Sequence, residues 1–176
     1  TSLKKNEYDI IVFRQVLEHI IDLDLFLSNV NKALKDKGSI VIEIPDTSWN
    51  LECLDYSLWE EHVNYFTINT LKNLLSKHQF EIIHYERTLF SGVALTVFAQ
   101  KAQKKLSFNI SIDERKKINN YKNKFNKLKT YFHESFDKEE NIVIYGCGSR
   151  SSNFVNLFSL DMICCFVDDQ NEKQNY

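Results

Sequence analysis

The chain has 176 residues, enough for one ordinary domain or for parts of two. Hydrophobic residues make up 43% of it and charged residues 26%, a balance that is typical of a globular protein and excludes an intrinsically disordered chain. The net charge of -2 gives no basic footprint for nucleic acid, and no apolar run reaches the length of a membrane span, so we expect neither partner.

The four cysteines are Cys53, Cys147, Cys164 and Cys165, and they show no metal-ligand spacing, so we expect no metal. Cys164 and Cys165 lie in an apolar run and are expected to be buried free thiols. Free thiols suit a reducing compartment, which indicates a cytoplasmic protein. The chain opens on Thr1 instead of Met, which suggests a fragment.

The first part of the chain predicts a parallel strand–helix–strand unit. A β-branched and aromatic run over 8–13 predicts a buried strand, and apolar residues at helical spacing predict a helix over 23–35. Gly38 is expected to end this helix as a left-handed cap, and S-I-V-I-E-I over 39–44 predicts the second strand. Short connections then favour a parallel crossover.

An irregular, aromatic segment is expected over 46–66, where no periodicity is evident. Thr67 is expected to cap a helix that runs to about residue 78. Two further strands over 80–88 and 93–101, separated by Ser91-Gly92, predict an antiparallel hairpin.

The last part of the chain predicts a second α/β unit. Residues 102–110 are polar and basic and are expected to be a linker, and 111–137 shows the apolar stripe of a long amphipathic helix. A strand, a helix and a strand are then predicted over 141–145, 150–158 and 162–167. We therefore expect one partial α/β domain over 1–101 and the start of another over 111–176.

Three segments carry candidate functional side chains, and the first is R-Q-V-L-E-H over 14–19. It follows the end of a strand, where open α/β sheets bind their ligands, and His19 can transfer a proton there. Packing by Val16 and Leu17, with His19 bound to nearby backbone, is the alternative.

The second segment is W-E-E-H over 59–62, followed by N-Y-F-T. Glu61 beside His62 makes a reasonable acid/base pair, because a carboxylate can orient an imidazole that titrates near neutral pH. A purely structural loop is equally compatible with these residues.

The third segment is the turn Gly146-x-Gly148-x-x-Ser151, in which glycines and free N–H groups at a helix start favour an anion or a phosphate. Asp168 ends the following strand and is placed to accept a ribose hydroxyl. A glycine turn without a ligand and an exposed strand-end acid are the alternatives.

In this order the segments resemble the second half of a class I S-adenosylmethionine-dependent methyltransferase. The runs Y-D-I-I-V-F-R-Q-V-L-E-H-I, L-K-D-K-G-S-I-V-I-E-I-P-D and E-E-H-V-N-Y-F-T are similar to the sugar C-methyltransferases. I-V-I-Y-G-C-G-S-R-S and I-C-C-F-V-D-D-Q-N-E-K-Q resemble the start of their C-terminal Rossmann-like domain. The resemblance implies a partial Rossmann-like methyltransferase sheet ending in an antiparallel hairpin, then a long helix and a partial βαβ unit.

The resemblance also implies roles for individual residues. His62 would be the general base that removes a proton next to a ketone, Glu61 would orient it, and His19 would help to hold the substrate. The cofactor, S-adenosylmethionine, would meet residues just after the first strand: Arg14, Gln15 and Val16. A nucleotide-linked deoxysugar would contact Trp59, Tyr65, Gly146, Gly148, Ser149 and Asp168.

Some family features have no counterpart. Trp59 stands where the family has tyrosine, and the strands and glycine-rich loop that hold the cofactor are not found before residue 8. We therefore expect this chain alone to bind S-adenosylmethionine weakly, and its open strand edges to favour homo-oligomers. A non-catalytic methyltransferase-like fragment or interaction module, and a nicotinamide-nucleotide-binding protein based on Gly146 and Asp168, are the alternatives.

Overall fold

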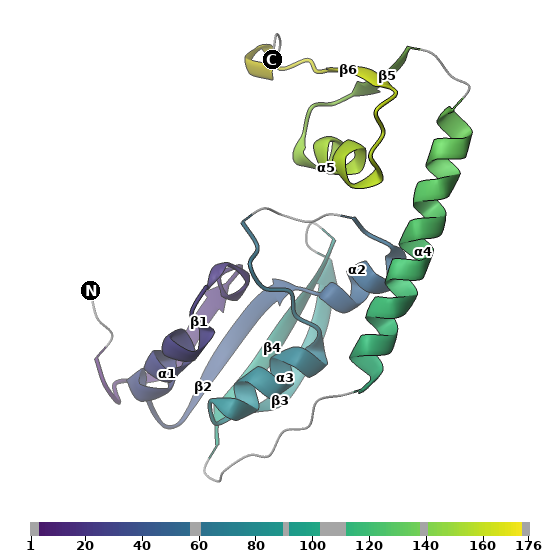
Figure 1. Ribbon diagram of the computed structural model, residues 1–176. Helices are drawn as coiled ribbons and strands as arrows, with labels where there is room; N and C mark the ends of the chain where they lie inside the picture. The colour runs from purple at the N-terminus through teal and green to yellow at the C-terminus, as the bar shows by residue number, and fades with distance from the viewer. Residues whose placement is uncertain (1–3, 57–60, 90–91, 103–111, 138–140, 174–176) are drawn as a thin grey trace. The chain divides into compact units, whose positions relative to one another are not determined.

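The computed structural model describes residues 4–56, 61–89, 92–102, 112–137 and 141–173 (Figure 1). The chain is mixed α/β and divides into two compact units. The first unit comprises residues 1–49 and 60–114, and the second unit comprises 50–59 and 115–176. The predicted boundary at the linker, over 102–110, lies almost entirely outside the described residues and stays a prediction.

The first unit is built on a four-stranded sheet with the order β1-β2-β4-β3. Its strands are β1 (Tyr8–Arg14), β2 (Leu34–Pro45), β3 (Phe80–Leu89) and β4 (Val93–Lys101). β1 and β2 are parallel and are joined by α1 (Leu23–Ala33), whereas β4 runs antiparallel to both β2 and β3. The structure therefore confirms the predicted parallel unit and the predicted hairpin.

The core of this unit lies between one face of the sheet and the helices α1 and α3 (Ile68–Lys77), which lie side by side over it (Figure 1). Buried residues from the helices pack against alternate residues of β2 and β4: Leu27, Val30, Leu71, Leu75, Ile40, Ile42, Ile44, Leu95 and Val97. Each such side chain contributes about 1.5–3 kcal/mol through burial. Thr67 caps α3, as predicted, and the structure adds a capping box with Thr70.

The expectation that β1 is a buried strand was wrong. Ile10 and Val12 are 61% and 59% exposed, whereas Phe13 is buried. Successive side chains of a strand point to opposite faces, and α1 and α3 cover only the face that Phe13 joins. β1 also lies at the edge of the sheet, with β2 as its neighbour.

Gly38 is not the left-handed cap that the sequence suggested. The helix ends at Ala33, and the left-handed residue is Lys37, with φ of 65°. Gly38 belongs to β2, where an added Cβ would lie 2.9 Å from Lys35 O and 3.2 Å from Asp9 O. Glycine is needed here because two backbone segments pass close to it.

The expected irregular segment over 46–66 contains a short helix, α2 (Thr47–Cys53), which the sequence analysis missed. The buried carboxylate of Asp46 organises its start: Oδ1 accepts the N–H of Ser48 at 2.9 Å, and Oδ2 pairs with Arg87 Nε at 2.6 Å. Residues 61–66 contain no helix, as expected, and residue 59 lies outside the described residues.

The second unit contains most of α4 (Ile112–Phe136), then β5 (Ile142–Tyr145), α5 (Ser149–Phe158) and β6 (Ile163–Val167). β5 and β6 are parallel, which confirms the second predicted unit, and clustered aromatic rings from α4 and α5 include Phe125, Phe132, Phe154 and Phe158. None of the described helices is both long and apolar enough to cross a membrane.

The prediction of buried thiols at Cys164 and Cys165 was wrong, because both residues are exposed. They are free, as expected, but they lie in β6 of a two-stranded sheet. In β6 only Ile163 and Phe166 are partly buried, so an apolar run in so small a sheet does not bury all its members.

Candidate functional site

The candidate site lies where the parallel strands β1 and β2 end, at their shared carboxyl edge. This is the edge at which open α/β sheets bind ligands. β1 leads through residues 15 and 16 into a short 3₁₀ helix, η1 (Leu17–His19). The loop over 61–65 packs against η1 by hydrogen bonds, so the first two predicted segments meet in the first unit.

The turn after β1 holds the residues expected to meet the cofactor. Gln15 has a left-handed backbone, with φ of 51°, and its N–H donates to Glu43 O in β2 at 2.8 Å. Arg14 Nη2 lies 2.9 Å from the Glu43 carboxylate, and Gln15 Nε2 also donates to that carboxylate, at 3.4 Å. A non-glycine residue in this conformation is uncommon and is often found at ligand sites. Cofactor contacts from Arg14, Gln15 and Val16 stay a prediction.

The loop is fastened to η1 mainly through one carbonyl group. Glu18 O accepts the N–H groups of Val63 and Asn64, at 2.9 and 3.0 Å. The Asn64 side-chain amide donates to Ile20 O at 2.7 Å. These bonds fix the backbone that follows His62 relative to η1.

The two predicted histidines lie together, edge toward face. Their ring centroids are 4.8 Å apart, with an angle of 77° between the planes, and the ring of Tyr65 lies 6.2 Å from that of His62. His19 Nδ1 lies 2.9 Å from Glu61 O. Because a carbonyl oxygen only accepts hydrogen bonds, Nδ1 carries the hydrogen.

The surroundings of His62 favour the neutral form of its ring. Burial lowers the pKa of His62 below its ordinary value of 6.5, and the nearby His19 lowers it further. The charge of Glu61 acts in the opposite direction and is the smallest of the three effects. A neutral imidazole can accept a proton or bind a metal ion, whereas an imidazolium can do neither. That Glu61 orients His62 stays a prediction.

Glu18 is a site residue that the sequence analysis did not single out. Glu18 is 1% exposed, and neither of its carboxylate oxygens has a hydrogen-bond partner within the described part of the chain. Burial raises the pKa of this carboxyl group above its ordinary value of 4.5. Its position directly before His19 was the signal available in the sequence, but only the fold shows that it is buried.

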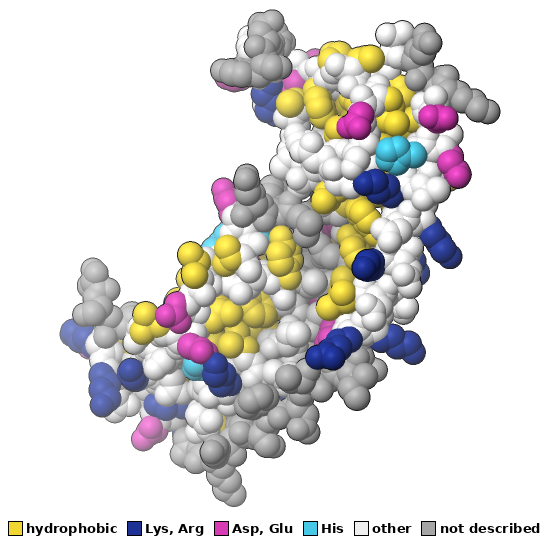
Figure 2. Space-filling view, in the orientation of Figure 1, with side chains coloured by type: hydrophobic (Ala, Val, Ile, Leu, Met, Phe, Trp, Pro, Cys, Tyr) yellow, Lys and Arg dark blue, Asp and Glu magenta, His cyan; other side chains and the backbone are white. Residues whose placement is uncertain are grey.

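Exposed apolar side chains lie close to the site residues in the sequence. Figure 2 shows hydrophobic side chains on the surface of the first unit. One exposed apolar residue follows η1 and two belong to the loop over 61–65: Ile21, Val63 and Tyr65. Apolar surface beside a few convergent polar groups is typical of a site for an organic molecule. Trp59, expected to contact the substrate, lies outside the described residues.

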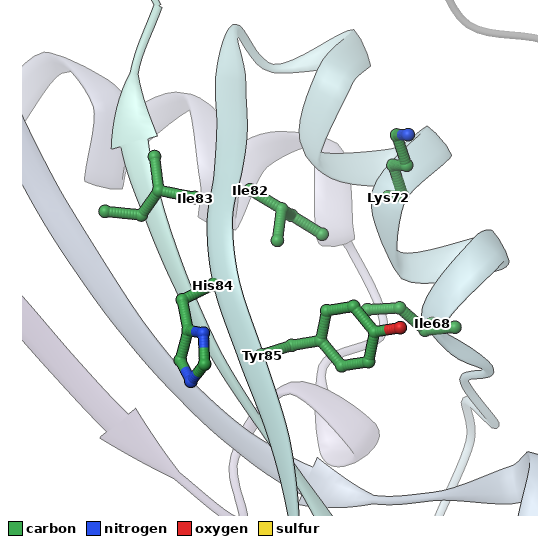
Figure 3. A pocket seen from close by; sticks show the side chains of 6 residues that line it. All are labelled: Ile68, Lys72, Ile82, Ile83, His84 and Tyr85. Carbon is green, nitrogen blue, oxygen red and sulfur yellow. The ribbon is translucent and has the colours of Figure 1, made fainter.

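A separate pocket of about 310 Å³ lies between α3 and β3 (Figure 3). Its lining is Ile68, Lys72, Ile82, Ile83, His84 and Tyr85. None of the residues predicted for catalysis or binding belongs to this lining, so the pocket is distinct from the histidine pair.

The third predicted segment lies in the second unit. Gly146 has φ of 96°, which explains the glycine, and Gly148 precedes α5 with open space where a Cβ would stand. Cys147 N–H is not free: it donates to Asp168 Oδ2 at 2.7 Å, while Gln170 N–H donates to Oδ1 at 2.9 Å. These two bonds lower the pKa of Asp168. Binding roles for Gly146, Gly148, Ser149 and Asp168 stay predictions.

Comparison with known proteins gives matches for the first part of the chain. Residues 2–85, just under half of the chain, match the family model for a methyltransferase domain. The ubiquinone biosynthesis O-methyltransferase of Bartonella quintana (strain Toulouse) is 30% identical over 91 residues, which are 46% of this chain and 37% of that protein. The chain thus spans little more than a third of the length of this relative.

Similar solved structures include an S-adenosylmethionine-dependent methyltransferase from Methanosarcina mazei, with 18% identity and a TM-score of 0.47 over 59% of this chain and 64% of that one. Another is the 1,6-didemethyltoxoflavin-N1-methyltransferase of Burkholderia thailandensis, with 17% identity and a TM-score of 0.46 over 57% of this chain and 46% of that one. The family match agrees with the methyltransferase resemblance in its general form, over residues 2–85.

Proposed function

We propose that this methyltransferase domain transfers a methyl group from S-adenosylmethionine to a small organic acceptor, with His62 as the general base. The observation that carries the proposal is the His19–His62 pair at the carboxyl edge of β1 and β2. Two imidazoles 4.8 Å apart, at the edge where such sheets bind ligands, provide the proton transfer that an acceptor needs before it attacks a methyl group.

The chemistry follows from the state of each ring. When bound, S-adenosylmethionine supplies an electrophilic methyl group. His62 is neutral, so it can take a proton from a carbon next to a ketone or from a hydroxyl group. His19 donates through Nδ1 to Glu61 O, which leaves Nε2 to hold the acceptor's oxygen when that nitrogen is protonated.

Two classes of acceptor are supported by different observations. The similarity of E-E-H-V-N-Y-F-T to sugar C-methyltransferases favours a ketone of a nucleotide-linked deoxysugar, with Tyr65 on the sugar. In the second unit, taken by itself, Gly146, Gly148, Ser149 and Asp168 would hold a nucleotide. The relative from Bartonella quintana is named as an O-methyltransferase, which favours a hydroxyl acceptor as the second candidate. Arg14, Gln15 and Val16 would hold the cofactor in both cases.

The test measures release of S-adenosylhomocysteine by mass spectrometry. The purified protein is incubated with either a nucleotide-linked keto-deoxysugar or a catechol. S-adenosylmethionine is added at high concentration, because weak binding of the cofactor is expected. We expect turnover of one acceptor, and a loss of about a hundredfold or more in kcat for His62→Ala. His84→Ala, which changes an exposed histidine of β3 outside the site, is the control and should keep the wild-type rate.

The outcomes separate the two parts of the proposal. An unchanged rate in His62→Ala would reject the general base. Absence of S-adenosylhomocysteine with every acceptor, in a protein that melts cooperatively, would reject methyl transfer.

A further inference from the structure

Three potential metal ligands converge at the carboxyl edge of the first unit. Glu18, His19 and His62 each offer one ligand atom, and these three atoms all lie within 4.8 Å of one another. Glu18 and His19 come from η1, and His62 comes from the loop over 61–65. The bonds from Val63 N–H and Asn64 N–H to Glu18 O hold these two segments together, so the cluster is built by the backbone.

The carboxylate of Glu18 is the independent sign that a cation belongs here. The residue is 1% exposed, and both carboxylate oxygens lack a hydrogen-bond partner within the described residues. A buried carboxylate is normally paired, hydrogen-bonded or bound to a metal, because taking an uncompensated charge out of water is strongly unfavourable. A cation between Glu18 and the two histidines would supply the missing partner.

The hydrogen bond of His19 prepares its ring as a ligand. Nδ1–H donates to Glu61 O at 2.9 Å, so Nε2 of the neutral ring carries the lone pair. Metal-binding histidines usually donate their other ring N–H to a carbonyl or a carboxylate, which fixes the tautomer and the ring orientation.

We propose that Glu18, His19 and His62 bind one divalent ion of the first transition series, with Zn²⁺ as the reference case. Two imidazole nitrogens and one carboxylate oxygen suit such an ion, whereas Mg²⁺ prefers oxygen ligands. Ligands about 2.0–2.2 Å from Zn²⁺ lie roughly 3.3–3.6 Å from one another, so groups now within 4.8 Å reach the ion by small side-chain rotations. The absence of a metal was expected from the spacing of the cysteines, which are not part of this cluster.

A three-ligand site leaves at least one coordination position open, as catalytic zinc sites do. This open position would take the oxygen of the acceptor, a consequence that rests on the proposed methyl transfer. A His62 nitrogen that binds the ion cannot act as a base, so the general-base role proposed above applies to the metal-free protein. Titration with Zn²⁺ tests the metal site, and kcat measured in EDTA tests the base.

Metal binding is measured on the full chain without S-adenosylmethionine. Zn²⁺ is titrated by calorimetry after treatment with EDTA and its removal, and Co²⁺ is titrated by visible absorption. We expect one ion per chain, and at least about a tenfold weaker affinity in Glu18→Gln and in His62→Ala. The controls Glu81→Gln and His84→Ala make the same two types of substitution at exposed residues of β3. Both should bind Zn²⁺ with the affinity of the wild type.

Glu18→Gln keeps the shape of the side chain and removes a buried charge, so it is expected to fold, and its circular dichroism melt checks this. Zn²⁺ should raise the Tm of the wild type but not that of Glu18→Gln. Equal Zn²⁺ affinity in the wild type and Glu18→Gln, or no binding by the wild type, would overturn the site. Methyl transfer without metal binding would overturn this inference alone, whereas metal binding without methyl transfer supports it and counts against the proposed function.

Discussion

The side chain of Asn64 fastens the loop over the histidines, and Asn64→Ala weakens that attachment without removing either ring. The amide donates to Ile20 O at 2.7 Å, whereas its second contact, to Leu17 O at 3.5 Å, is too long to contribute much. One net hydrogen bond is worth about 1 kcal/mol, and Ile20 is only partly buried, so water can replace the lost donor. The two backbone bonds to Glu18 O remain. We therefore expect Asn64→Ala to lower the free energy of unfolding by about 1 kcal/mol.

Asn64→Asp provides the sharper comparison, because it has nearly the same shape. Near neutral pH its carboxylate cannot donate and faces the carbonyl oxygen of Ile20, so it should destabilise the protein more than Asn64→Ala does. Urea unfolding followed by circular dichroism gives the midpoints, and an unchanged slope shows that the same structure unfolds. A midpoint for Asn64→Asp equal to that of the wild type, or a loss above about 3 kcal/mol in Asn64→Ala, would refute this account.

Two further predictions concern single buried positions. Burial raises the pKa of Glu18 above its ordinary 4.5, so between the unfolded and the folded pKa the folded protein keeps a proton that the unfolded chain has lost. This contribution to stability is complete below the unfolded pKa and disappears as pH rises through the folded pKa, so the wild type should lose stability relative to Glu18→Gln over that interval. Urea midpoints of the two proteins, measured in EDTA, test this, and midpoints that change in parallel with pH would contradict it. Gly38→Ala should lower the free energy of unfolding by about 1–3 kcal/mol, because its Cβ would meet Lys35 O. Lys37→Gly should stabilise the protein, because glycine adopts the left-handed φ of this position without strain. Thermal melts compare both variants with the wild type, and a Tm of Gly38→Ala above that of the wild type would contradict the expected clash.

Local patterns were enough to predict most elements of the fold. The runs that became β1, β2 and α1 carry strand and helix periodicity, and Thr67 carries its own capping signal. Burial and close approach were not predictable in the same way. An apolar run does not reveal whether both faces of a strand are covered, as Ile10 shows, and the crowding at Gly38 comes partly from Asp9, which is distant in the sequence.

The site was predictable in part. His19 and His62 were singled out from the segments that contain them, and their proximity was implied by the family resemblance. Glu18 was missed because a glutamate in a short motif is most often solvated, and its burial depends on the loop that docks through Val63 and Asn64. Only the three-dimensional arrangement turns this acid into a candidate ligand.

Glu18 also separates two kinds of heritable change. The main-chain oxygen of Glu18 holds the loop, and a residue of any type would offer the same oxygen. The potential ligand beside the histidines, in contrast, belongs to the side chain. A substitution at this position can therefore alter the chemistry of the site while the anchor persists. Substitutions at position 18 can therefore change the reactivity of the site during evolution, while the backbone hydrogen bonds that position the loop with His62 remain.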